Sequence, residues 1–462
     1  MTKPSIPQGT RDFGPAIVRK RNFIFSTIRD VFELYGFQPL ETPAMENLET
    51  LMGKYGEEGD KLIFKILNNG LDNPDKEQKT REGFEKALQG KSSTLLTERA
   101  LKYDLTIPFA RYVAMNQGTL AFPFRRYQMQ PVWRADKPQR GRYREFYQCD
   151  ADIVGSRALL NEVELANLYN DVFTRLGVSG FELRINNRKI LSALAERCGG
   201  PEKMMDITIA IDKLDKIGME KVKTELQAKG LSTGQIDIIE QYLLIDGSNE
   251  EKLQRITELF GSSQTGQKGI EEVRFLLLHT GSSGAEGHSP VPIVLDLTLA
   301  RGLNYYTGII FEVKAPSSVK IGSIGGGGRY DDLTGLFGVP NIPGVGISFG
   351  VDRIYDVMEE LQLFPETVEQ GTKVLFFNLG EAESSAAYSF VQQLRRRGIA
   401  AELYHENAKF DKQFRYAEKK QIPFAAILGT KELEERTLVI KDLRTGKQNP
   451  VSFANLTEFL FI

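Results

Sequence analysis

The chain has 462 residues, enough for about three domains, and its apolar and charged fractions of 41% and 26% are those of an ordinary globular protein. Its formal net charge of −2 excludes nucleic-acid binding through an overall positive field and leaves only local basic patches. Two cysteines, Cys149 and Cys198, are too few for a disulfide framework, and no apolar run resembles a signal peptide or a membrane helix, so we expect a cytosolic protein.

The N-terminal segment predicts a helix, a short strand and a loop. Apolar residues recur at helical spacing from Ile17 to Tyr35, and Gly36 follows as a natural C-terminal stop, so we expect an amphipathic helix. Residues 37–43 predict a short strand that ends in a proline turn. The stretch 68–93 is rich in Lys, Glu, Asp and Gly, and it predicts a mobile loop between two strands.

The next elements are a helix, a pair of strands and a second helix. Residues 105–115 carry a proline where a first helical turn tolerates it, which predicts a helix. The stretches 126–132 and 143–154 predict paired strands joined by the polar turn 135–140. Helical spacing returns over residues 159–176.

The character of the chain then changes twice. Lys, Glu, Leu and Ile dominate residues 188–287 at helical spacing, which predicts a separate helical insertion. Strand signals return at 293–297, 309–313 and 345–349, and we expect a helix to begin near Val351.

After a linker at 363–370, strand and helix patterns alternate, which predicts a small parallel or mixed α/β domain. The expected strands are 374–378, 401–404 and 424–428, and the expected helices are 386–397 and 412–420.

Cations and aromatic rings are interleaved between Phe124 and Val154, and this run ends in carboxylates and an amide. Guanidinium groups suit phosphate, flat rings suit a base and carboxylates suit an ammonium group, so the segment fits a nucleotide joined to an amino acid. A salt-bridged surface hairpin explains the same residues equally well. The cations are Arg125, Arg126, Arg134, Lys137, Arg140, Arg142 and Arg144, and the polar end consists of Glu145, Gln148, Asp150 and Asp152.

Three glycine-containing blocks follow. In residues 301–308, an arginine beside glycine is able to approach a phosphate, although a strand entry with edge tyrosines explains the same block. The four glycines of 325–328 require close backbone approach, either to a ligand beneath a sheet or in a flexible turn. The glycines of 345–353 suggest that a flat ligand lies against a strand. Arg353 would stack on that ligand, or it only caps the next helix or forms a local salt bridge. The three histidines have no metal-ligand spacing with one another, so no protein metal site is assigned.

The order of these blocks resembles that of class II aminoacyl-tRNA synthetases. The residues within them resemble those of the histidyl-tRNA synthetase family, and this resemblance extends over nearly the whole chain. The segments that resemble the three class signatures are 36–43, 134–146 and 345–353, and those that resemble histidine-specific signatures are 104–106, 301–306 and 327–330. Asp136 and Asn304 stand where that family often has Glu and Asp.

The resemblance implies an α/β (α+β) fold in which helices flank a class II antiparallel sheet, with a helical insertion and a C-terminal α/β anticodon-binding domain. The implied parts are residues 1–187 and 290–365 for the catalytic core, 188–289 for the insertion and 372–462 for the anticodon-binding domain.

The resemblance also implies a cytoplasmic homodimer that uses ATP and Mg²⁺ to attach L-histidine to tRNA(His). Arg134 and Arg301 would be the catalytic pair around the α-phosphate. The implied histidine-binding residues are Asp104, Leu105, Thr106, Arg134, Gln148, Asp152, Arg301, Tyr305, Tyr306 and Tyr330, and the implied ATP-binding residues are Arg134, Arg142, Phe146, Arg301 and Arg353. Which carboxylate meets the imidazole and which the ammonium group is left open.

Two alternatives accompany this interpretation. A regulatory paralogue would bind histidine without catalysis, but such proteins lack the anticodon domain and tend to lose the phosphate-binding arginines. A plain nucleic-acid-binding protein would not need the acid and tyrosine cluster. The basic surface proposed for the anticodon consists of Arg395, Arg396, Arg397, Lys409, Lys412, Arg415, Lys419 and Lys420.

Overall fold

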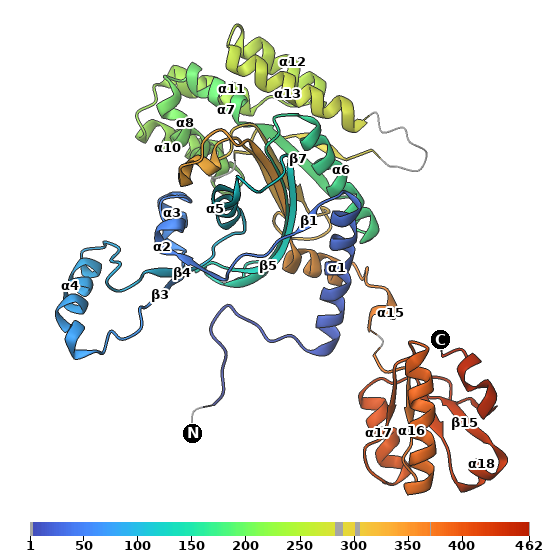
Figure 1. The fold of residues 1–462 in the computed structure, drawn as a ribbon. Helices are drawn as coiled ribbons and strands as arrows, with labels where there is room; N and C mark the ends of the chain where they lie inside the picture. Colours follow the sequence, from blue (N-terminus) through green and yellow to red (C-terminus); the bar gives the residue numbers. More distant parts are fainter. Residues whose placement is uncertain (1–2, 282–289, 301–304, 370, 462) are drawn as a thin grey trace. The chain divides into compact units, whose positions relative to one another are not determined.

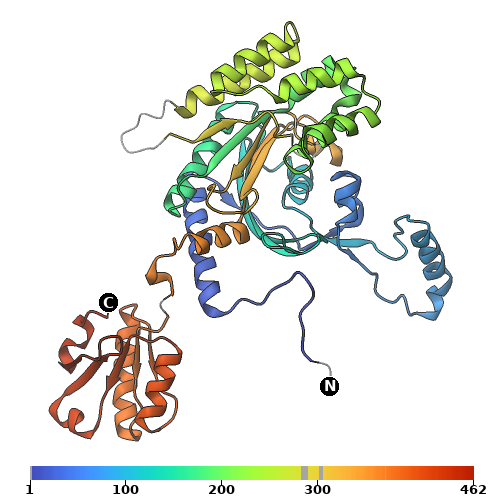
Figure 2. The ribbon, with the colours of Figure 1, turned by 180° about the vertical axis from the view of Figure 1, so that it is seen from behind.

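The computed structural model describes residues 3–281, 290–300, 305–369 and 371–461. The chain forms two compact units, Met1–Leu363 and Phe364–Ile462, and Figure 1 and Figure 2 show the ribbon of each from opposite sides. Within the described ranges, none of the helices is both long enough and apolar enough to cross a membrane.

The first unit is built on a sheet that has eight strands among the described residues, in the order β1-β5-β6-β11-β10-β9-β7-β8. The pairs at the two ends, β1 with β5 and β7 with β8, are parallel, and all pairs between them are antiparallel. The strands are β1 (Gln38–Pro39), β5 (Phe124–Trp133), β6 (Glu145–Val154), β7 (Glu182–Asn187), β8 (Ile293–Leu295), β9 (Ile309–Lys314), β10 (Gly325–Tyr330) and β11 (Gly344–Gly350). The predicted antiparallel sheet and the paired strands around the polar turn are confirmed.

Helices α1 (Pro15–Leu34), α6 (Leu160–Arg175) and α14 (Val351–Glu360) pack together against one face of this sheet (Figure 1). The prediction of α1 is confirmed, because its apolar residues Ile24 and Ile28 are fully buried. Helix α5 (Thr106–Asn116) lies on the other side of the sheet. A small sheet, β2 (Met45–Asn47), β4 (Arg99–Leu101) and β3 (Lys65–Ile66), adjoins the short helices α2 (Leu48–Leu51) and α3 (Gly56–Lys61).

The loop predicted for residues 68–93 is wrong, because this stretch contains the helix α4 (Glu77–Leu88). Most α4 residues are strong helix formers, and Glu77 pairs with Arg81 one turn later at 2.6 Å. Only Gly83 of α4 is buried, against Leu96. The helix therefore lacks the apolar stripe on which the sequence prediction relied.

Helices α7 to α13 follow one another between β7 and β8, as the helical pattern predicted. Their bounds are α7 (Arg188–Arg197), α8 (Met204–Asp212), α9 (Leu214–Ile217), α10 (Met219–Ala228), α11 (Thr233–Leu243), α12 (Asn249–Phe260) and α13 (Gln264–Gly281). Helix α13 packs against α6 and β7, and Asn187 donates a hydrogen bond to Glu272 of α13 at 2.8 Å. That these helices are a separate insertion domain stays a prediction.

The second unit is a mixed sheet in the order β13-β12-β14-β15-β16. Its predicted strand–helix alternation is confirmed by β12 (Val374–Phe376), α16 (Glu381–Arg396), β13 (Ala401–Leu403), α17 (Phe410–Lys419) and β14 (Phe424–Ile427). Its other elements, which the sequence did not reveal, are α15 (Glu366–Glu369), α18 (Thr430–Glu435), β15 (Thr437–Asp442) and β16 (Gln448–Ser452).

Candidate active site

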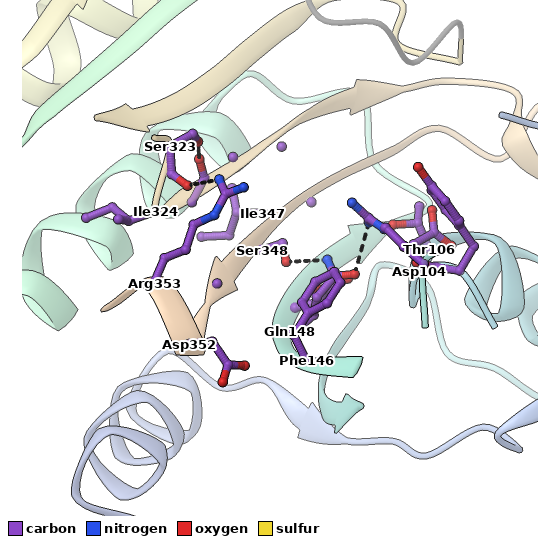
Figure 3. Close-up of a pocket in the computed structure, with 18 of the residues that line it drawn as sticks. Asp104, Thr106, Phe146, Gln148, Ser323, Ile324, Ile347, Ser348, Asp352 and Arg353 are labelled. Atoms are coloured by element: carbon purple, nitrogen blue, oxygen red, sulfur yellow. Dashed lines mark hydrogen bonds between the residues drawn. The ribbon is translucent and has the colours of Figure 1, made fainter. Parts of the chain in front are cut away.

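A cavity of about 440 Å³ opens over β6, β10 and β11, on the side of the sheet where α5 lies. Figure 3 shows how side chains from β6 and β11, from the start of α5 and from α14 converge on it. The predicted site residues that line the cavity are Asp104, Thr106, Arg134, Arg142, Phe146, Gln148, Asp152, Tyr305, Tyr306, Tyr330 and Arg353. The structure therefore brings together residues that are far apart in the sequence.

Two predicted residues are not among them. Leu105 does not line the cavity: it is fully buried, and its carbonyl oxygen accepts a hydrogen bond from Arg126 at 3.3 Å. An apolar side chain just before α5 packs into the core, so its assignment to histidine binding is not supported by this geometry. Arg301 and the neighbouring Asn304 lie outside the described residues.

Alternation along β6 places Gln148, Asp150 and Asp152 on the cavity side of the sheet. Strand β11 runs opposite, so Gly346 is the partner of Asp152 and Ser348 is the partner of Asp150. A Cβ atom at Gly346 would lie 1.9 Å from Oδ1 of Asp152, so glycine is needed here to admit the carboxylate.

The four glycines of 325–328 belong to β10, a paired strand rather than a flexible turn. A Cβ atom at Gly327 would lie 2.0 Å from the carbonyl oxygen of Gly346, so the close approach of β10 to β11 excludes any side chain there. Several of these glycines also form part of the cavity wall. The glycine run thus lets strand backbone line the site.

Two buried carboxylates mark one end of the cavity. Asp104 accepts hydrogen bonds from the Tyr55 hydroxyl at 3.0 Å and from the Ile107 N–H at 3.1 Å. Asp152 accepts one from the Tyr330 hydroxyl and pairs with Arg126 at 2.9 Å. Burial raises the pKa of both carboxyl groups, and the nearby arginines oppose that shift.

Arg134 projects into the middle of the cavity. Its Nε donates to the Tyr103 carbonyl at 3.0 Å, and one terminal nitrogen lies 3.4 Å from Oε1 of Gln148. Its guanidinium lies 4.3 Å from the ring centroid of Tyr103 and 5.2 Å from that of Phe146. These contacts fix the plane of the guanidinium group and leave part of it directed into the cavity.

An aromatic ring and a second guanidinium group also line the cavity: Phe146 lies beside Gln148, and Arg353 lies near Ser323 and Ile324 (Figure 3). Arg353 donates to the Gly141 carbonyl at 2.6 Å and to the Ser323 carbonyl at 2.5 Å. Hydrogen bonds to two separate loops therefore hold its guanidinium in place. Arg142 lies beside Asp136 at 3.7 Å. An aromatic ring and a guanidinium plane are both surfaces on which a planar group is able to stack.

Sequence reasoning missed residues that support the site from behind. Arg126 is fully buried and pairs with Asp152, although the sequence suggested only a member of a cationic run. Asp352 accepts from Arg11 and from Arg21, the latter at 2.6 Å, and so joins the N-terminal segment to the start of α14. The alternation of polar residues at 126, 128 and 130 was the one available signal.

Asp150 was noted in the sequence but given no role. It is 2% exposed and lines the same cavity as Asp104 and Asp152. Burial raises its pKa to about 7, whereas Arg126 lowers it and Asp152 raises it further. In the described part of the chain, no group of three or more His, Cys, Asp or Glu side chains is placed to hold a metal ion.

The sequence was compared with known proteins. A family model described as histidyl-tRNA synthetase matches residues 87–354, and one described as an anticodon binding domain matches residues 373–460. Curated relatives named histidine–tRNA ligase from Christiangramia forsetii and Flavobacterium johnsoniae are 52% and 51% identical, over 98% and 99% of both chains respectively.

Solved structures of the same family resemble this fold. The crystal structure of histidyl-tRNA synthetase from Nostoc sp. PCC 7120 is similar to this structure with a TM-score of 0.81 and 31% sequence identity over 99% of both chains. An ATP phosphoribosyltransferase regulatory subunit/histidyl-tRNA synthetase from Bacillus halodurans, 22% identical with a TM-score of 0.71 over 90% of this chain and 97% of its own, shares the fold. With relatives of about half identity along its full length, this chain belongs to the histidyl-tRNA synthetase family.

Proposed function

We propose that this protein is a histidine–tRNA ligase that converts L-histidine and ATP into histidyl-adenylate and pyrophosphate, then transfers histidine to the 3′ end of tRNA(His). The observation that carries the proposal is one cavity that is lined by buried Asp104 and Asp152, by Arg134, and by Phe146 and Arg353, with Asp104 and Arg353 on opposite sides (Figure 3). These groups suit an amino acid, a phosphate and a purine in that order.

The reaction joins two anions, because the histidine carboxylate attacks the α-phosphate of ATP. Arg134 would offset their repulsion and stabilise the charge that develops on the phosphoryl oxygens. Arg301 would act from the opposite side of the same phosphate. Mg²⁺ would neutralise part of the triphosphate charge when bound, carried mainly by phosphate oxygens and water, as Mg²⁺ commonly is. No protein nucleophile is needed.

Histidine selection would depend on hydrogen-bond polarity. A buried carboxylate that receives an imidazole N–H is left unpaired by the other amino acids, and this penalty discriminates strongly. Asp104 and Asp152 would bind the imidazole and the ammonium group between them, with Tyr330 holding Asp152 in place. Thr106, Gln148, Tyr305 and Tyr306 would complete the pocket.

The second unit would bind the anticodon. Lys412, Arg415 and Lys419 are exposed on one face of α17, whereas Gln413 and Ala417 of the same helix are buried. Lys420 pairs with Glu402 at 2.9 Å, which partly neutralises its charge. Lys412 lies 3.8 Å from Glu406, a longer and more exposed pair. We therefore assign most of the contact with the RNA backbone to Lys412, Arg415 and Lys419.

Further parts of the proposal concern assembly and layout. The protein would be a cytoplasmic homodimer joined around residues 36–43. The catalytic core would comprise residues 1–187 and 290–365, with an insertion at 188–289 and the anticodon-binding domain at 372–462. Sedimentation at micromolar concentration tests the dimer, and a monomer there would contradict the assignment of residues 36–43.

ATP–pyrophosphate exchange in the presence of each of the twenty amino acids tests the proposed function. We expect exchange with histidine alone, because one of the two buried carboxylates requires the imidazole N–H as its donor. Absence of exchange together with retained histidine binding would instead indicate a regulatory paralogue. Equal RNA binding with and without ATP and histidine, and no exchange, would indicate a plain nucleic-acid-binding protein.

Arg301→Ala is expected to lower histidine-dependent exchange by about a hundredfold, because one of two charges opposed across the phosphate is lost. The variant should fold normally, which circular dichroism and the unfolding midpoint would check. Near-normal exchange would remove Arg301 from this role.

A further inference from the structure

Asp150 lies between two residues that the proposed function uses, Gln148 and Asp152, and it faces the same cavity. Strand pairing sets it directly opposite Ser348 of β11, which places the two side chains next to each other on one face of the sheet. The Ser348 hydroxyl, as a donor, lowers the pKa of the Asp150 carboxyl. Its Oδ1 atom is buried and has no hydrogen-bond partner among the residues that the structure describes. Burying a carboxylate oxygen without a partner lowers the stability of the fold, which indicates that this side chain is kept for a functional reason.

The carboxylate determines the direction of the hydrogen bonds around it. An ionised carboxylate only accepts, and a hydroxyl has one hydrogen to donate, so Ser348 donates to Asp150 and keeps only acceptor capacity toward other groups. Nε2 of Gln148 lies 2.8 Å from Oγ of Ser348 and donates to it (Figure 3). Oε1 of Gln148 is then turned toward Arg134, whose guanidinium lies 3.4 Å away.

We propose that Asp150 is a positioning residue for histidine recognition: acting through Ser348, it fixes which end of the Gln148 amide faces Arg134 and the substrate. The two ends of an amide have nearly the same shape, so packing does not distinguish them and hydrogen-bond polarity must do so. This inference rests on the proposed function, because it assumes that Gln148 contacts histidine.

The proposal predicts what a neutral side chain at position 150 does. The amide of asparagine is able to donate to Ser348, whose hydroxyl is then free to donate to Gln148. The NH₂ group of Gln148 would then lose its fixed acceptor, and only Arg134 would still favour the present orientation of the amide. A fraction of the molecules would present NH₂ to Arg134, donor against donor, and in that fraction the substrate would lose an acceptor. The volume of the side chain and the packing of the strands would stay the same.

Asp150→Asn is therefore expected to raise the KM for histidine by about tenfold or more and to leave the KM for ATP unchanged. ATP–pyrophosphate exchange at pH 8, with one substrate varied and the other saturating, measures both constants while wild-type Asp150 is ionised. Asp171→Asn is the matched control: Asp171 accepts a hydrogen bond from Tyr35 at 2.7 Å on α6, outside the cavity, and neither KM should change.

Ser348→Ala provides the second arm, and it carries the test alone if Asp150→Asn does not fold. Removing the hydroxyl should also raise the KM for histidine, and Asp150→Asn should add nothing further in that background, because the chain of hydrogen bonds is already broken. An unchanged KM for histidine, a parallel rise in both constants, or additive effects in the double variant would each overturn the proposal. Lack of histidine-dependent exchange in the wild type would instead overturn the proposed function.

Discussion

Arg134→Ala is expected to reduce histidine-dependent ATP–pyrophosphate exchange by about a thousandfold or more, while the chain stays folded. The Arg134 guanidinium is held by the Tyr103 carbonyl at 3.0 Å and by stacking on the Tyr103 ring at 4.3 Å. A charge already fixed in place need not reorganise as negative charge builds on the phosphoryl oxygens, so its loss raises the barrier directly. Exchange at saturating histidine and ATP measures this step without tRNA.

Arg125→Ala is the matched control, because Arg125 lies at the start of β5, the strand that ends just before Arg134, and its guanidinium pairs with Glu164 at 2.5 Å, away from the cavity. It should retain exchange. Arg134→Lys keeps the charge but loses the planar two-pronged donor, and we expect an intermediate loss. Exchange by Arg134→Ala at about a tenth of the wild-type rate or better would contradict a role at the phosphate.

Elements that bury an apolar stripe were predictable from the sequence, and those that do not were missed. Helix α1 was predictable because its apolar residues, among them Ile24, Ile28 and Val31, recur at helical spacing and are buried in the core. Helix α4 has one buried residue, Gly83, so its helix-forming side chains looked like a polar loop. Periodicity reports burial rather than backbone conformation, and the two coincide only where a helix packs on something.

The site shows a related limit. The resemblance named Asp104, Gln148 and Asp152, and all three line one cavity. It did not name Ser348 or Asp150, because their significance arises from the pairing of β11 with β6, which no local pattern encodes. Strand register turns residues that look like ordinary strand polar groups into a connected network.

The buried ion pair of Glu162 and Arg329 is a second contact that the sequence does not reveal, since its partners are separated by 167 positions. Arg329 belongs to the predicted histidine signature, yet its guanidinium points away from the cavity and binds both oxygens of Glu162, at 2.5 and 2.7 Å. Its backbone carbonyl accepts from the Thr307 N–H at 2.8 Å, and the next residue, Tyr330, holds Asp152. The pair thus anchors β10 behind the histidine end of the cavity.

Glu162→Ala is expected to lower the free energy of unfolding of the first unit by about 3–5 kcal/mol, because it leaves the Arg329 charge buried without its main partner. Glu162 is fully buried and Arg329 is 4% exposed, so water cannot replace the lost carboxylate without opening the structure. Urea unfolding followed by the fluorescence of Trp133, the one tryptophan of the chain, reports on this unit alone.

Glu77→Ala, which breaks the exposed pair with Arg81, is the control and should lower the free energy of unfolding by at most about 0.5 kcal/mol. A similar small loss in Glu162→Ala would mean that Arg329 finds adequate partners in Asp331, at 3.2 Å, and in the Ser156 and Ala158 carbonyls, and that Glu162 does not anchor the strand.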